Sequence, residues 1–127
     1  MSFFYITDDA MPDGGNGDDD VVVLTAAGEI DYEAAPQLRE RILEHTKAGR
    51  RRLLLDLSTV TFIDSTAIGV LVGAITGLQD VDGGSLMIVC IEENKRVLRI
   101  LEISGVTSLV TLHPSREHAL STLATAG

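Results

Sequence analysis

The sequence predicts an α/β fold, with a mixed, mostly parallel sheet of four to five strands and about four helices packed against it. Short β-branched or apolar runs alternate with segments whose apolar residues recur at helical spacing. Alternating βα units require parallel strands joined by right-handed crossovers. The run LLLDL at 53–57 is almost continuously apolar, as in strands covered by helices. We expect one domain over residues 1–127, a length that buries a substantial core.

The first two strands are expected to pair as an antiparallel hairpin. The runs FFYI at 3–6 and VVVLTAA at 21–27 form its two arms. Between them, residues 8–20 (DDAMPDGGNGDDD) are rich in Gly and Asp and cannot bury apolar surface. This composition predicts a flexible acidic loop, and therefore an unusually long connection within the hairpin.

Helices and strands alternate after the hairpin, which gives the order β-β-α-β-α-β-α-β-α. Pro36 near its start and Gly49 after its end delimit a first helix at 33–48. The later elements are expected as strands at 53–57, 86–91 and 108–112 and as helices at 65–79, 93–103 and 114 to about 124.

Charge and cysteine content exclude several classes of partner. The net charge of −9 argues against nucleic acid and anionic membranes. The single Cys90 rules out an internal disulfide and supplies no Cys pair for zinc, so we expect a cytoplasmic protein in a reducing compartment. The uncharged stretch 65–78 is too short to span a bilayer and is typical of a buried helix.

The chain carries no recognisable motif for catalysis or cofactor binding. Ser65 lacks the flanking glycines of a G-x-S-x-G elbow, and no P-loop, GxGxxG or CxxC sequence is present. His45, His113 and His118 have no spacing that pairs them with Ser65 or with a metal. The acidic stretch also lacks the EF-hand spacing. We therefore expect a protein that is not an enzyme and that has no cofactor and no metal site.

The start of the helix at 65–79 is the candidate functional site. It follows a strand's carboxyl end, the edge at which open α/β proteins place their sites. Asp64 is a good N-cap for the backbone N–H of Thr66 or Ala67, which leaves the Ser65 hydroxyl at an exposed tip. Two interpretations are open. Asp64 and Ser65 only cap the helix, or Ser65 accepts a phosphate, which would meet free N–H groups and the helix dipole.

Glycines recur along this helix at Gly69, Gly73 and Gly77. The spacing i, i+4, i+8 places them on one face. We expect this smooth face to pack closely against the sheet or a neighbouring helix, because the segment is too short for a membrane pairing motif.

The string VTFIDSTAIGVLVGA at 60–74 resembles the signature of STAS domains, specifically of bacterial anti-sigma factor antagonists. Their pattern is an apolar strand, then Asp-Ser-Ser/Thr-Gly-Leu/Ile-Gly, then an apolar helix. The resemblance covers about residues 20–125, and Ala67 departs from it by replacing the usual Gly. A methyl there favours helix by about 1 kcal/mol and would stiffen the helix entry. Four further segments match in register: LTAAGEID (24–31), LLLDLSTV (53–60), GGSLMIVC (83–90) and VLRILEISGV (97–106).

The resemblance implies a binding switch controlled by phosphorylation. Such proteins sequester an anti-sigma factor that is also a serine kinase of the histidine-kinase ATPase type, and so free a sigma factor. The kinase releases them by phosphorylating the serine after the signature Asp, here Ser65, and a PP2C-type phosphatase resets them. The implied partner-binding residues are Glu29, Asp31, Tyr32, Asp64, Ser65, Thr66, Ile68 and Gly69.

Two other functions are alternatives. One is a scaffold component of a signalling assembly that is not phosphorylated. The other is a receiver-like domain phosphorylated on Asp, since Asp8, Asp9 and Asp56 echo an acidic pocket. A receiver needs a helix directly after its acidic pair and a Lys after its last strand, and neither 10–20 nor the sequence beyond Lys95 supplies them. Asp56 is therefore expected to be a residue at a strand end.

Overall fold

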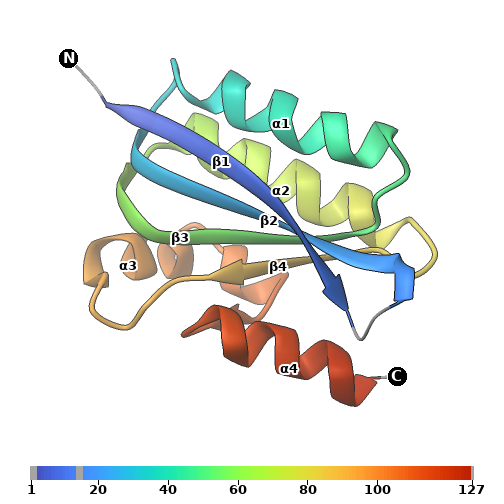
Figure 1. Ribbon diagram of the computed structural model, residues 1–127. Coiled ribbons are helices and arrows are strands. Elements are labelled where there is room, and N and C mark those ends of the chain that lie inside the picture. The colour runs from blue at the N-terminus through green and yellow to red at the C-terminus, as the bar shows by residue number, and fades with distance from the viewer. Residues whose placement is uncertain (1–2, 14–15, 127) are drawn as a thin grey trace.

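The computed structural model describes residues 3–13 and 16–126. Its centre is a five-stranded sheet in the order β1-β2-β3-β4-β5 (Figure 1). The elements are β1 (Phe4–Asp13), β2 (Asn16–Ile30), α1 (Ala35–Lys47), β3 (Arg52–Ile63), α2 (Ser65–Gln79), β4 (Ser85–Val89), α3 (Lys95–Ile103), a 3₁₀ turn (Val106–Ser108), β5 (Leu112–His113) and α4 (Arg116–Ala126).

The hairpin is longer than the sequence predicts. β1 pairs with β2 from Phe4 opposite Gly28 to Asp13 opposite Asn16, so the expectation of a loop at 8–20 is wrong for the described residues of that stretch. Backbone pairing at a sheet edge tolerates charge, and charged residues are a common feature of edge strands. The strand pairing that begins in the two apolar arms therefore continues into the acidic residues that follow β1's apolar start and precede β2's apolar run. Residues 14 and 15 lie outside the described residues.

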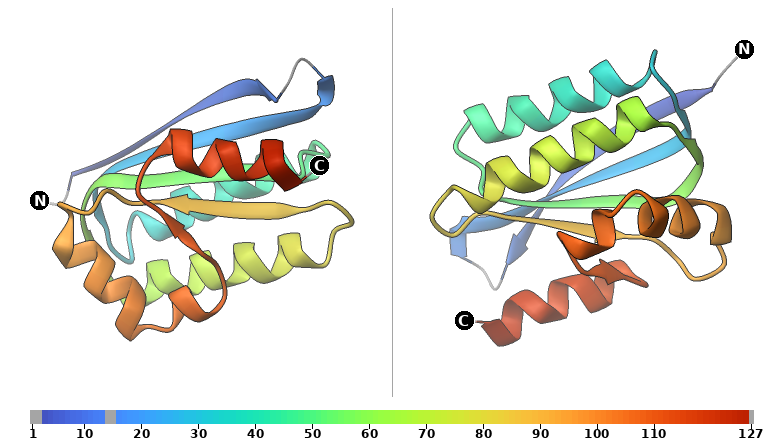
Figure 2. Two further views of the ribbon diagram at one scale, coloured as in Figure 1. Left: turned by 90° about the horizontal axis from the view of Figure 1, so that it is seen from below. Right: turned by 180° about the vertical axis from the view of Figure 1, so that it is seen from behind.

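The chain order dictates which face each helix covers. β2, β3, β4 and β5 are parallel and follow one another across the sheet. Because each crossover is right-handed, the three connecting helices lie on the same face. α1 and α2 lie side by side there, with α3 beside them, and α4 covers the opposite face (Figures 1 and 2).

The core is aliphatic on both faces of the sheet. Leu24, Leu55 and Leu71 belong to the larger cluster between the sheet and α1–α3. A smaller cluster, which includes Leu54 and Ala119, lies under α4. No Phe or Tyr ring is among the buried side chains of the described part of the chain. None of the helices described for residues 3–13 and 16–126 is long and apolar enough to cross a membrane.

The last strand differs most from its expected position. The sequence predicts a strand at 108–112, but Gly105 adopts φ +89° and a 3₁₀ turn follows at Val106–Ser108. The strand is thereby delayed to Leu112–His113. By contrast, α2 occupies Ser65–Gln79, the range expected from the sequence.

Candidate functional site

The turns that follow β2 and β3 lie next to each other at the carboxyl edge of the sheet. Glu29 pairs with Phe62, and Ile30 with Ile63, in the parallel ladder. The backbone N–H of Asp64 then donates to the carbonyl of Ile30 at 3.2 Å. Two segments far apart in the sequence, 29–34 and 62–69, therefore form one edge.

In each of these turns, an aspartate side chain accepts hydrogen bonds from backbone N–H groups two or three residues later. Asp64 Oδ1 accepts from the backbone N–H of Ala67 at 3.0 Å, which makes it the N-cap of α2. Asp31 Oδ1 accepts from the N–H groups of Glu33 and Ala34, at 3.0 Å each, ahead of α1. The N-cap at Asp64 stabilises α2 by about 1 kcal/mol, whereas Asp31 closes the turn before α1, whose N-cap is Ala34. Both acids expected to contact a partner thus also have a structural role.

Ser65 is the first residue of α2, and its side chain is exposed. In the described part of the chain, the N–H groups of Ser65 and Thr66 have no hydrogen-bond acceptor, as is usual for the first turn of a helix. Ala67 faces the other way and is fully buried in the core. A phosphate on the Ser65 hydroxyl would therefore sit in solvent near two free donors and the positive end of the helix dipole.

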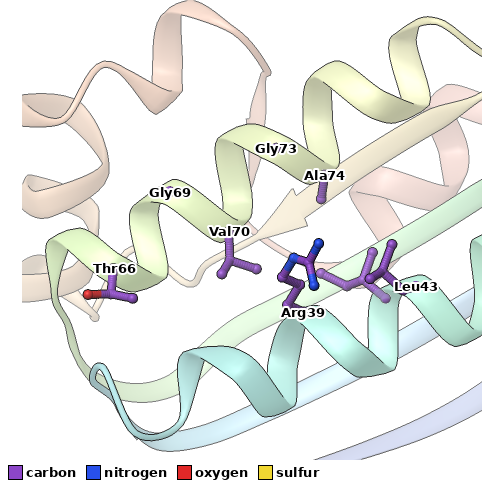
Figure 3. Close-up of a pocket in the computed structure, with 8 residues that line it drawn as sticks. Arg39, Leu43, Thr66, Gly69, Val70, Gly73 and Ala74 are labelled. Atoms are coloured by element: carbon purple, nitrogen blue, oxygen red, sulfur yellow. The ribbon is translucent and has the colours of Figure 1, made fainter.

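The other expected contact residues lie along the same edge with different exposure. Tyr32 is exposed on the turn before α1. Glu29 is half-buried, and Ile68 packs partly against the core. Thr66 and Gly69 line a groove of about 380 Å³ between α1 and α2. In Figure 3, Arg39 and Leu43 of α1 face Val70 and Ala74 of α2 across this groove.

The glycines of α2 do not pack as the sequence predicts. Gly69, Gly73 and Gly77 are all exposed, and a Cβ added at any of them would meet nothing within 4 Å. The expectation of close packing against the sheet or a neighbouring helix is therefore wrong. α2 packs through its opposite face, where Leu71, Ile75 and other apolar residues are buried.

The structure does not assemble the acidic pocket of a receiver. Asp8 on β1 contacts Arg41 at 3.1 Å and His45 at 2.8 Å, both on α1. Asp56 lies within β3, not at its end, and is buried toward α4, where its Oδ2 accepts from Arg116 Nε at 2.7 Å. The carboxylates of Asp8 and Asp56 therefore face opposite sides of the sheet. They cannot form the shared acidic pocket on which the receiver-like alternative depends.

Asp56 also affects the one thiol of the chain. Cys90 is buried, and burial followed by the negative charge of Asp56 raises its pKa to about 11. The thiol therefore stays protonated at neutral pH, a state in which cysteine neither attacks as a nucleophile nor binds a metal. No group of three His, Cys, Asp or Glu among the described residues could hold a metal ion.

Sequence reasoning missed Asn94, which supports the strand leading to Ser65. Pairing of β3 with β4 ends at Asp56 opposite Val89, so among the described residues the later part of β3 has no strand on that side. Asn94 Nδ2 donates instead to the carbonyls of Ser58 at 3.2 Å and Val60 at 2.8 Å. An Asn directly before a helix signals an N-cap, but its contacts with β3 depend on tertiary structure.

Comparisons with known proteins agree with this geometry. The family model described as STAS domain matches residues 16–119. A Bacillus subtilis (strain 168) protein named anti-sigma-B factor antagonist is 32% identical over 96 residues, which cover 76% of this chain and 84% of that protein. The crystal structure of an anti-sigma factor antagonist from Mycobacterium paratuberculosis superposes with TM-score 0.75 at 25% identity, covering 94% and 95% of the two chains. The phosphorylated form of the Bacillus cell fate determinant SpoIIAA shares the fold, with TM-score 0.63 at 19% identity over 92% and 99% of the chains.

Proposed function

This chain belongs to the STAS domain family, and we propose that it acts as an anti-sigma factor antagonist whose binding is switched by phosphorylation of Ser65. The observation that carries this proposal is the exposed hydroxyl at the first position of α2, beside an N-cap that leaves it free. The protein would act in the cytoplasm by binding, not by catalysis, and as one domain. Its partner would be an anti-sigma factor that is also a serine kinase of the histidine-kinase ATPase type.

The switch follows from a charge change at a side chain, Ser65, that does not contribute to the core. A phosphate adds about −1.5 to −2 charges and three acceptor oxygens. The free N–H groups of Ser65 and Thr66 and the helix dipole favour it, while the carboxylate of Asp64 repels it. These effects oppose each other, so the fold changes little in stability while the surface seen by the partner changes greatly. Removal of the phosphate by a PP2C-type phosphatase would restore binding.

Mass spectrometry of the intact protein tests the acceptor. After incubation with the cognate anti-sigma kinase and ATP, we expect one added phosphate on the wild type and none on Ser65→Ala. Thr66→Ala is the matched control, because Thr66 is the neighbouring exposed hydroxyl on the same turn. It should also gain one phosphate; because Thr66 is itself an expected contact of the kinase, the number of phosphates and not the rate is compared. Phosphate on Ser65→Ala would refute the assignment.

A binding measurement tests the consequence of the added charge. Ser65→Asp should weaken binding of the anti-sigma factor, while its melting temperature stays close to that of the wild type. A large loss of stability would mean that Ser65 is structural. Binding by a wild type that the kinase never phosphorylates would instead support the role of a scaffold component.

A further inference from the structure

The aromatic residues of this protein gather outside its core, at one end of the sheet. Four of the five are exposed: Phe3 by 62%, Tyr5 by 50%, Tyr32 by 67% and Phe62 by 38%. We call these four residues the aromatic surface. Large rings contribute most to stability when they are buried, and clusters of exposed rings mark interaction sites.

The topology explains why rings on this part of the sheet stay uncovered. The three crossover helices occupy one face, and α4, on the other face, packs mainly over β3, β4 and β5 (Figure 2, left). A shallow hollow of about 370 Å³ remains on that face near the carboxyl edge. Phe3 and Tyr5 line one side of it, and Thr59 and Thr61 of β3 line the other.

The backbone holds the first of these rings in place. Gly28 adopts φ +90°, and a Cβ there would collide with the Phe3 carbonyl oxygen and come within 2.8 Å of the Phe3 ring. The backbone N–H of Glu29 donates to the same carbonyl at 2.7 Å. The Phe3 and Tyr5 rings then meet edge to face, with centroids 5.3 Å apart. The pair is thus preorganised, which lowers the entropy cost of binding.

The aromatic surface is continuous with the Ser65 edge, because Glu29 belongs to both the hollow and the expected contact set and pairs with Phe62. The sequence segments that form it are acidic. The segments 3–7, 29–34 and 57–66 contain no Lys or Arg, and their acids are Glu29, Asp31, Glu33 and Asp64.

We propose that the aromatic surface is a second part of the docking site and binds an arginine-bearing surface of the anti-sigma factor. A guanidinium can stack on an aromatic ring and also pair with a carboxylate, a combination that lysine fits less well. A second copy of this chain is disfavoured as the occupant, since it would bring the same acids and a net charge of −9. This inference rests on the proposed function and extends its interface beyond Ser65.

Calorimetric titration of the purified cognate anti-sigma factor into variants of the full chain tests the inference. The double variant Phe3→Ala/Tyr5→Ala should raise the Kd at least tenfold, as truncation of interface rings commonly does. Tyr5→Phe should bind like the wild type, because it keeps the ring. Ile103→Ala is the matched control, since Ile103 is 75% exposed on α3, on the other face of the sheet, and its loss should leave the Kd unchanged. Glu29→Gln should make the Kd less dependent on salt.

The outcomes separate this inference from the proposed function. If Ser65→Asp weakens binding but Phe3→Ala/Tyr5→Ala does not, the switch stands and the aromatic surface is not part of the interface. If the wild type does not bind the anti-sigma factor at all, both proposals fall. Sedimentation that shows a dimer of the wild type, lost in the double variant, would assign the surface to a second copy and overturn the arginine-bearing partner.

Discussion

Replacing Gly73 and Gly77 by alanine should stabilise the protein. Both lie in the interior of α2, both are exposed, and a Cβ at either would meet nothing within 4 Å. Neither has positive φ, so alanine adopts the native backbone without strain. Gly is about 1 kcal/mol less favourable than Ala in a helix interior, because it loses more conformational entropy on folding.

The two positions are i,i+4 neighbours, but alanine carries only a methyl group and neither methyl meets another element, so we expect the two effects to be close to additive. The double variant is therefore expected to gain about 2 kcal/mol in the free energy of unfolding. In a chain of this length, that corresponds to a rise in Tm of roughly 6 to 10 °C.

Urea unfolding followed by far-UV circular dichroism measures the effect, with wild type, both single variants and the double variant at one pH. Gly28→Ala is the matched control. It makes the same chemical change where a Cβ would collide with Phe3 and φ is +90°, so it should destabilise the protein. A loss of stability in Gly73→Ala and Gly77→Ala would show that these positions do pack against another element, and would refute the reasoning from open space.

Two further predictions concern buried titratable groups. Burial, and secondarily the nearby His118, lower the pKa of His113, so the folded state binds fewer protons than the unfolded state below about pH 6.5. The free energy of unfolding should therefore fall as the pH is lowered from 7.5 to 5.5. His113→Gln should make this dependence on pH weaker. An unchanged dependence in the variant would exclude His113 as its source. Cys90 is buried and its pKa is raised to about 11. Iodoacetamide at pH 8 should therefore modify Cys90 in urea but not in the folded protein. Rapid modification of the folded protein would contradict the burial of the thiol.

The sequence predicted correctly those elements whose ends are set by neighbouring residues, such as an N-cap or an uncharged run. The bounds of α2 follow from Asp64 as N-cap and from an uncharged run that only a covered helix can bury. The placement of Asp31 on the same edge as Asp64 was implied by the resemblance to STAS domains, and the parallel pairing of β2 with β3 accounts for it. The bounds of α2 could be read from the sequence because they depend on neighbouring residues and not on a tertiary contact.

The features that the sequence did not predict all depend on contacts between residues far apart in the chain. The pairing of β1 with β2 beyond Asp8 is set by register across the hairpin, which composition does not encode. The glycine spacing in α2 defines a face, but not whether that face meets the sheet or solvent. The contacts of Asn94 with the β3 carbonyls are made by residues more than 30 positions away. The FFY run could have located Phe3 and Tyr5 on one face by alternation, once the hairpin register was known.

The start of α2 separates the residues that the fold uses from those that it leaves free. Asp64 is engaged as the cap, and the Ala67 methyl is buried in the core, so the alanine that replaces the family's glycine acts on the packed side of the helix. Ser65 and Thr66 point outward between them and contribute little to the core. A helix entry stiffened by Ala67 therefore keeps the cap in place without covering the serine. For the switch that we propose, rigidity beneath the hydroxyl is an advantage, because added charge then changes recognition without changing the fold.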